Sequence, residues 1–421
     1  MFHFFCSFGL ATGVLIALLL ITLLGTLEQV EHGLYETTHK YFDSPFLSDI
    51  DIGCCLRAFH IAHQGHLVLP LQLKFGQTAI PFVPSGYLLM VVLFINLALG
   101  AVVRIRKSLR NFGVILAHLS ILFMLIAGFV SFYFKTEGSM TLAEGQTSNE
   151  FQSFNDSVIE IQRVFPVPDA SKDSVMIIDG REYKDLSEDK ARLFTSKDLP
   201  FDLLVSNYEV NAEPRKLKEG ETRLYAQADG YFIQPKARDP EAEKNFDAAF
   251  VKVTDKKTKE EHTGILWRVN AAPFAVKVGD EMYTIDLTRR KWTLPFAVRL
   301  DKFEREFHPG TGRPRKFTSA VTRNPGGHEE KKIITMNAPY REPASHFWEG
   351  NYVLFQHSFG QAESGNGPVR SVLEVVRNPS DQWPLYALFA AMLGLLIHMI
   401  MRLSSFLTRY KPTPVGPPPA A

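Results

Sequence analysis

The chain has 421 residues, which exceeds the usual span of one hydrophobic core, so one to three domains are expected. Its 46 basic and 45 acidic side chains nearly cancel, which argues against a nucleic-acid-binding protein, because such proteins carry a strong positive excess. Hydrophobic residues make up 46% of the chain but are unevenly distributed. Residues 1–27 contain no Asp, Glu, Lys or Arg, whereas residues 135–383 hold 36 basic and 39 acidic side chains. This distribution predicts a membrane protein with a large water-facing domain.

Four segments are long and apolar enough to cross ~30 Å of hydrocarbon, which takes roughly 20 residues of helix. They are residues 8–27, 85–103, 112–134 and 384–403. A cleaved signal peptide is the alternative for the first segment. No small-residue cleavage pattern precedes Glu28, so we expect an uncleaved anchor.

The short loops predict an orientation, because cytoplasmic loops carry an excess of Lys and Arg. The loop 104–111 has four basic and no acidic side chains, and residues 402–411 have three basic and none acidic. The loop 28–84 has three basic side chains against six acidic ones. We therefore expect both termini, including the Pro-rich tail 404–421, on the cytoplasmic side. The loop 28–84 and the domain 135–383 are expected outside.

The domain 135–383 is rich in short alternating runs bounded by turn residues. Runs such as SVIEIQRV, FDLLVSNYEV and NYVLFQHSF each indicate a β-strand. Eleven such runs with few helices favour a β-sandwich or a barrel-like architecture, although the strand order is not readable from them. The predicted fold is therefore a membrane protein with four transmembrane α-helices plus a large extracytoplasmic all-β domain, sandwich- or barrel-like.

Two histidines fall within the predicted spans, His118 in the third and His398 in the fourth, and intramembrane histidine is rare. At 1.5 Å per residue, both lie roughly 9–10 Å from the cytoplasmic surface. A neutral imidazole is a good axial ligand for haem iron, and an apolar pocket between helices suits a porphyrin. One hypothesis is a haem site, favoured at His118 by the neighbouring basic loop 104–111. The alternative is that each imidazole hydrogen-bonds a neighbouring carbonyl or a serine such as Ser120.

A second group of candidate ligands lies in the loop after the first span, in the stretch CCLRAFHIAHQGH. Thiols and imidazoles together bind zinc, copper or haem. The residues concerned are Cys54, Cys55, His60, His63 and His66. Adjacent cysteines are not the spacing of a standard zinc motif, so the alternative is a surface-lying amphipathic segment with incidental histidines. Three cysteines in all exclude an extensive disulfide framework.

Several longer stretches follow one another in an informative order. LGTLEQVEHGLYETTHKYFDSPF follows the first span, and RIRKSLRNFGVILAHLSILFMLIAG forms the third. MTLAEGQTSNE opens the β domain, and NYVLFQHSF and SVLEVVRNP precede the last span. Together, over nearly the whole chain, they resemble the ResB (CcsB) family of cytochrome c biogenesis proteins.

The resemblance implies a role in type II cytochrome c maturation at the cytoplasmic (inner) membrane. Members of the family work with a CcsA-type membrane protein that carries a WWD haem-handling motif. The complex moves haem b outward and holds it for covalent attachment to an apocytochrome c. The transmembrane histidine of the family corresponds to His118, whereas His398 is proposed on its depth alone. No WWD stretch occurs in this chain, so the partner is expected to be a separate protein.

Three classes of function follow from these observations. The first is a non-catalytic or co-catalytic subunit of a cytochrome c haem-lyase complex. The second is a membrane scaffold for assembly of a respiratory complex or an apocytochrome, without haem binding. The third is a membrane-anchored receptor. An intramembrane histidine beside a basic loop favours the first class over the third, because a receptor anchor needs neither.

Overall fold

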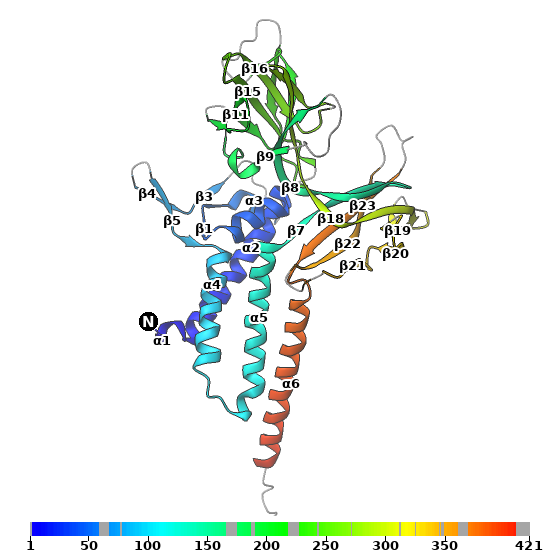
Figure 1. Ribbon diagram of the computed structural model, residues 1–421. Helices are drawn as coiled ribbons and strands as arrows, with labels where there is room; N and C mark the ends of the chain where they lie inside the picture. The colour runs from blue at the N-terminus through cyan, green and yellow to red at the C-terminus, as the bar shows by residue number, and fades with distance from the viewer. Residues whose placement is uncertain are drawn as a thin grey trace, which may run out of the picture.

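The computed structural model describes most of the chain. The described residues are 2–58, 67–75, 78–165, 175–186, 190–217, 227–241, 244–270, 272–310, 313–324, 326–344, 346, 349–360 and 369–409. Apolar helices form a stem at one end of the molecule, and two β-rich lobes lie at the other end (Figure 1). This arrangement confirms the expected combination of apolar helices with a large β region.

Four helices in the described part of the chain are long and apolar enough to cross a membrane. They are α2 (Phe8–Thr38, continued by the π-helix η1, His39–Asp43), α4 (Gly86–Asn96, continued by η2, Leu97–Val103), α5 (Phe112–Phe134, preceded by η3, Leu109–Asn111) and α6 (Trp383–Arg409). Two short helices, α1 (Phe2–Phe5) and α3 (Ile52–Ala58), flank α2. Leucine-rich runs without charge form these helices because each backbone hydrogen bond is made within the segment, as an apolar solvent demands.

The first helix is interrupted at Gly33, which has the left-handed backbone angles φ 78 and ψ 164. Glycine adopts this conformation without the steric cost that a Cβ atom brings. Residues 34–43, here called the return segment, then fold back along the helix. As a result the ring of Tyr41 lies 3.6 Å from the position that a Cβ on Gly25 would occupy. The apolar part of α2 is therefore followed by a compact turn, made by the end of the helix and the return segment.

Three two-stranded ribbons follow the return segment. β1 (Phe46–Leu47) pairs with β6 (Val83–Pro84), β2 (Asp49–Asp51) with β3 (Val68–Pro70), and β4 (Gln72–Phe75) with β5 (Thr78–Pro81). These ribbons connect α2 to α4.

The β region runs from residue 136 to residue 378, and all of its strand pairs are antiparallel. Its strands are β7 (Thr136–Ala143), β8 (Thr147–Val164), β9 (Val175–Asp179), β10 (Ala191–Thr195), β11 (Phe201–Glu209), β12 (Ala212–Lys216), β13 (Gln227–Ala228), β14 (Tyr231–Pro235), β15 (Ala248–Asp255), β16 (Glu261–Trp267), β17 (Phe274–Val278), β18 (Glu281–Phe307), β19 (Pro314–Arg323), β20 (Glu330–Thr335), β21 (Tyr340–Glu342), β22 (Asn351–Gly360) and β23 (Arg370–Asn378).

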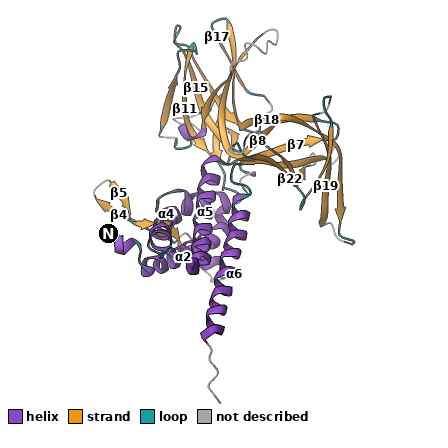
Figure 2. Ribbon diagram, turned by 60° about the horizontal axis from the view of Figure 1, so that its bottom comes forward, coloured by secondary structure: helices purple, strands orange, loops and turns teal. Residues whose placement is uncertain are grey.

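Two long strands, β8 and β18, pair with each other and lead from one lobe into the other (Figure 2). Lobe 1 holds β9 to β17 with the adjoining halves of β8 and β18. Lobe 2 holds β7 and β19 to β23 with the remaining halves. The pairing of β8 with β18 shifts register between Arg289 and Lys291 and again between Thr293 and Val298. Such irregularities bend and twist a strand pair, which allows one ribbon to serve two cores.

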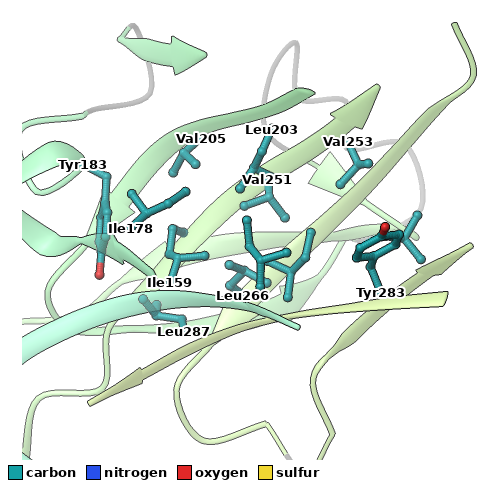
Figure 3. Packing of buried hydrophobic residues seen from close by; sticks show 14 of the residues in the cluster. Ile159, Ile178, Tyr183, Leu203, Val205, Val251, Val253, Leu266, Tyr283 and Leu287 are labelled. Carbon is teal, nitrogen blue, oxygen red and sulfur yellow. The ribbon is translucent and has the colours of Figure 1, made fainter. Parts of the chain in front are cut away.

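The main core of lobe 1 lies between two sheets, and a third sheet, β12-β14-β13, packs on the outer face of one of them through Ala212, Ile233 and Phe250. The sheet β10-β11-β15-β16 packs on the part of the large sheet formed by β9, β8, β18 and β17. Side chains from both layers meet between them, including Ile159, Ile178, Leu203, Val251 and Leu266 (Figure 3). Alternate residues are buried in the stretches 201–205 of β11 and 251–255 of β15, as the alternating sequence pattern predicts, whereas 205–208 and 248–251 are buried on both faces.

Lobe 2 has its own core, built around Met140, Phe151, Leu300 and Leu373. It stands directly on the stem, because α5 leads into β7 and β23 leads into α6. The hydroxyl of Ser380 donates to the carbonyl oxygen of Ala127 at 2.8 Å, so the entry and exit of the β region are fastened to each other.

Candidate functional site

The imidazole of His118 is half-buried on α5, and its Nδ1 lies 2.8 Å from the carbonyl oxygen of Val114 one turn earlier. A carbonyl oxygen only accepts hydrogen bonds, so Nδ1 carries the proton and Nε2 bears the lone pair. Metal-ligating histidines are held in this way, with one ring nitrogen bonded to a backbone carbonyl and the other turned to the metal. His118 therefore does bond a neighbouring carbonyl, as the alternative interpretation expected, but it does so through Nδ1. Its Nε2 keeps a lone pair that could bind iron. Ser120 bonds the carbonyl of Leu116 instead, at 2.7 Å.

His398 lies on α6, and its buried Nδ1 has no hydrogen-bond partner among the described residues. Its backbone packs against Gly113 of α5, where a Cβ atom would come within 2.6 Å of the His398 nitrogen and 2.5 Å of the Gly394 carbonyl oxygen. The two helices run antiparallel, since Gly113 faces His398 and Ala117 faces Gly394. His398 is therefore level with Gly113, five residues from His118. That corresponds to about 7.5 Å along the axis, so the two histidines share one half of the stem but not one level.

The close contact of α5 and α6 decides where a porphyrin would lie. Backbone atoms of the two helices meet at Gly113 and Gly394, as small residues in apolar helices permit. A flat macrocycle does not fit between helices at that separation. Any haem on His118 would thus lie on a flank of the pair, and a further protein surface would have to complete its pocket.

The vicinal cysteines of the loop segment are both buried on α3. Burial raises the pKa of Cys54 to about 12 and also raises the pKa of Cys55, so both thiols are protonated at neutral pH. Because the thiolate is the metal-binding and nucleophilic form, this burial does not support ligand chemistry at the pair. His60, His63 and His66 lie outside the described residues, and no group of three or more metal-ligating side chains occurs within the described ones.

A buried carboxylate lies where α2 leaves its apolar part. Glu28 accepts hydrogen bonds from the hydroxyl of Tyr41 at 2.7 Å, the ammonium of Lys40 at 2.9 Å and the backbone N–H of Asp51 at 2.7 Å. Lys40 also pairs with Asp49 at 2.7 Å. Burying a charge is costly unless it is paired and hydrogen-bonded, and here every oxygen of Glu28 has a donor. The network therefore holds the return segment and β2 onto the end of α2.

Two cavities flank the return segment. Cavity A, about 410 Å³, lies on the side of the Glu28 network, and its lining includes Glu28, Glu31, Glu36, Lys40, Asp49 and Asp51. Cavity B, about 230 Å³, lies between the return segment and lobe 1, and its lining includes His32, Tyr35, His39, Lys184, Asp247 and Arg289. His32, Glu36 and Arg238 line both cavities and separate them.

The return segment is docked onto lobe 1 by two contacts. A Cβ atom on Gly33 would overlap the carbonyl oxygen of Pro240, so this backbone approach is possible only for glycine. Three residues on, Glu36 pairs with Arg238 at 2.8 Å. The stem therefore meets the β region twice, through α5 and α6 under lobe 2 and through α2 under lobe 1.

The family model of the ResB-like family matches residues 88–168 and 170–366, which is most of the chain. The chain belongs to the ResB-like family. The family is linked to cytochrome c biogenesis, and with its four apolar helices this ResB-like chain is a membrane protein. No curated protein matches the chain in sequence.

The matched stretch of the ResB-like chain includes α5 with His118 and most of the β region, but neither His398 nor the return segment. Sequence reasoning found His118 and His398 because charge-free spans make any polar residue conspicuous. It missed Glu28 and both cavities. Glu28 is the first charged residue of the chain, and HKYFD places His39 and Asp43 four residues apart, which are the signals that were present.

Proposed function

We propose that this ResB-like protein is a subunit of a haem-delivery and cytochrome c synthase complex. It moves haem b outward across the membrane and presents it for covalent attachment to apocytochrome c. The link of the family to cytochrome c biogenesis supports this function. The observation that carries it is His118, an intramembrane imidazole whose Nε2 is left for a ligand by the hydrogen bond from Nδ1 to Val114.

In this proposal haem is cargo, and its iron supplies the centre that an imidazole nitrogen binds. His118 contributes Nε2, and the carbonyl of Val114 fixes the ring. The arginines and lysine of residues 104–110 lie at the start of α5, on the side of His118, where they attract the carboxylates of the porphyrin. The chain itself does no covalent chemistry in this account. It binds, orients and releases.

The pocket is completed by a partner membrane protein, which we take to be of the CcsA type with a WWD motif. Three features support a partner at this place. α5 and α6 leave no gap between them at Gly113 and Gly394. The Nδ1 of His398 has no partner among the described residues, and much of α6 is exposed, with Met399 at 65%. The other ligand to the iron would then be a histidine of the partner, and His398, which the closed contact of α5 and α6 separates from that haem, is a further candidate ligand of its own.

We further propose that both chain ends and the loop 104–111 are cytoplasmic and that the β region is extracytoplasmic, in the cytoplasmic (inner) membrane. The excess of basic residues in the loop 104–111 supports this orientation. It places His118 in the half of the membrane where haem enters and lobes 1 and 2 on the side where apocytochrome c is met.

The test is the haem content of the protein purified together with its membrane partner. His118→Ala should abolish or strongly reduce the haem absorption band, because the ligand is removed, and His398→Ala reports whether His398 binds haem as well. Ser120→Ala is the matched control, since Ser120 lies on the same helix and bonds only its own helix. An unchanged spectrum in His118→Ala removes His118 from the site. A colourless wild-type complex favours instead the scaffold that binds no haem.

A further inference from the structure

The segment that leads into α4 is nearly free of charge. Residues 67–84 read LVLPLQLKFGQTAIPFVP and contain one charged residue, Lys74. In the structure they form the strands β3 to β6, which lie at the β-region end of the stem. A surface segment of this composition indicates contact with something other than water.

Large apolar side chains of these ribbons are exposed. Leu73 and Phe82 each have 53% of their surface exposed, and Phe46 on β1 has 40%. Leu69 on β3 is exposed as well. Single exposed apolar residues are common on proteins, but a group of them marks a surface that binds a partner or a membrane.

The exposed side chains of the β4–β5 ribbon share one face. Leu73 pairs with Ile80, and the pairing continues where the backbone N–H of Phe82 donates to the carbonyl oxygen of Leu71 at 3.3 Å. Positions two apart on a strand, and positions paired across strands, lie on the same face, so Leu73 and Phe82 share a face. Gln72 lies on the opposite face, and the sequence LQLKF alternates apolar with polar residues. The ribbon is therefore amphipathic.

No other strand in the described part of the chain pairs with β4 or β5. A two-stranded ribbon is marginally stable in water by itself, and packing of an apolar face stabilises it. Figure 1 and Figure 2 show the ribbon projecting beside α4, away from both lobes. Its apolar face is thus left for a surface outside the described part of this chain.

The position of the ribbon favours lipid as that surface. β6 ends at Pro84, and the apolar span of α4 begins at Gly86. β1 pairs with β6 through Phe46 and Pro84, so Phe46 and Phe82 lie at the end of this span, where hydrocarbon gives way to headgroups. Exposed apolar side chains continue from there along α4. The apolar face of the ribbon therefore extends the lipid-facing surface of the helix.

We propose that the β4–β5 ribbon lies in the headgroup layer of the membrane, with Leu73 and Phe82 turned toward the hydrocarbon and Gln72 toward water. Amphipathic helices bind the interface by burying their apolar face ~5–10 Å into the boundary, and the same removal of apolar surface from water acts on a ribbon. The ribbon follows β3, whose partner β2 bonds Glu28 through the N–H of Asp51 at 2.7 Å. Contact with lipid would therefore also hold the end of α2 and its return segment at a fixed depth. This inference goes beyond the proposed handling of haem.

The test measures the depth of spin labels on the ribbon in the full chain, placed in nanodiscs of phosphatidylethanolamine and phosphatidylglycerol. Leu73→Cys, Phe82→Cys and Gln72→Cys each receive a nitroxide, and the wild-type chain, whose three cysteines are buried, gives the labelling background. Oxygen concentrates in hydrocarbon and a nickel chelate stays in water, so the ratio of their effects on relaxation reports depth. The labels at positions 73 and 82 should be relaxed more by oxygen than by nickel. The label at position 72 should show the reverse.

Two reference sites calibrate this ratio. Leu193→Cys replaces a leucine of similar exposure, 58%, on β10 of lobe 1, and its label should be relaxed mainly by nickel. Leu395→Cys replaces an exposed leucine within the span of α6, and its label should be relaxed mainly by oxygen. Each variant is accepted only if its thermal unfolding matches that of the wild type. Phe46→Cys takes the place of a ribbon variant that fails to fold.

The proposal is overturned if nickel relaxes the ribbon labels as strongly as it relaxes the label at position 193. It is also overturned if nickel reaches the ribbon labels in nanodiscs and no longer does so when the membrane partner is copurified, because the face then binds protein. Equal ratios at positions 72 and 73 overturn the assignment of the two faces. None of these outcomes involves haem, so this experiment and the His118 experiment stand or fall separately.

Discussion

Two contacts between distant parts of the chain are built in opposite ways. One joins helices α5 and α6, and the other is the junction between the return segment and lobe 1. In the helix pair, backbone meets backbone at Gly113 and Gly394, and the neighbouring side chains are small or apolar. At the junction, the contact is made by one ion pair, Glu36 with Arg238, and by the close approach of Gly33 to Pro240, and two cavities remain beside it.

The two contacts differ because apolar helices and charged side chains associate by different forces. Apolar helices gain little from burying apolar surface in lipid, so they associate by close packing and leave no internal space. Under the proposed function, their two histidines lie on a surface that a partner protein would cover. The junction is built from charged side chains, which are buried only when they are paired, and its cavities are bordered by side chains of this chain. Four experiments test this difference between the two contacts.

The largest effect is expected at Glu28, which anchors the junction. Glu28→Ala leaves Lys40, Tyr41 and the N–H of Asp51 without their acceptor, and should lower the free energy of unfolding by about 3–5 kcal/mol, as expected for breaking a buried charge network. Thermal unfolding in detergent measures it. Glu36→Ala is the control, because its pair with Arg238 is about half exposed and should be worth less than about 1 kcal/mol. If the two variants lose the same free energy of unfolding, the Glu28 network does not stabilise the fold more than an exposed ion pair does.

The helix pair is tested next by Gly113→Val. The new side chain meets the Gly394 carbonyl oxygen at 2.5 Å or closer, so the helices must separate, at a cost of about 1–3 kcal/mol. Gly128→Val on the same helix is the matched control, because nothing lies within 4 Å of its Cβ position, and its effect should stay within about 0.5 kcal/mol. If the two variants have the same thermal midpoint, the packing of α5 on α6 does not depend on the contact at Gly113.

Gly33→Ala probes the docking of the return segment. The Gly33→Ala variant carries two costs in free energy. An alanine must adopt the left-handed backbone conformation, and its Cβ atom overlaps the carbonyl oxygen of Pro240. Gly145→Ala carries only the first, since its φ is +80 and nothing lies within 4 Å, and it should cost about 1–2 kcal/mol. Gly33→Ala should cost more and should also speed hydrogen exchange in residues 236–241. Equal costs without faster exchange would mean that the Gly33–Pro240 approach does not hold the junction.

The smallest effect is a pH slope from Cys54. Its pKa is raised by burial to about 12 in the folded chain, against 9.0 ordinarily. Below pH 9 the thiol is protonated in both states and contributes no slope. Between pH 9 and 12 it ionises only when unfolded, so stability falls as the pH rises. The thermal midpoint should therefore drop more steeply from pH 8 to pH 10 in the wild type than in Cys54→Ser. A steeper drop in the variant would contradict the buried, protonated thiol.

The helices were readable from the sequence to within a few residues at α4 and α5, because a charge-free apolar run has no other stable structure in lipid. The β character of the second half was readable from alternation, since the period of two is a property of each strand alone. His118 and His398 were readable as candidates for the same reason as the helices: polar residues in such runs are rare.

Features that depend on contacts between distant parts of the chain were shown only by the tertiary structure. The sequence expected both histidines at one depth in a pocket between helices, whereas the antiparallel register of α5 on α6 separates their levels and closes the gap. Likewise, His39 and Lys184 are 145 residues apart, and no local pattern states that they border one cavity. Composition and periodicity determined which segments form long apolar helices and which form strands, because those choices depend on near neighbours. Register, close approach and cavities depend on long-range packing, and only the folded chain decided them.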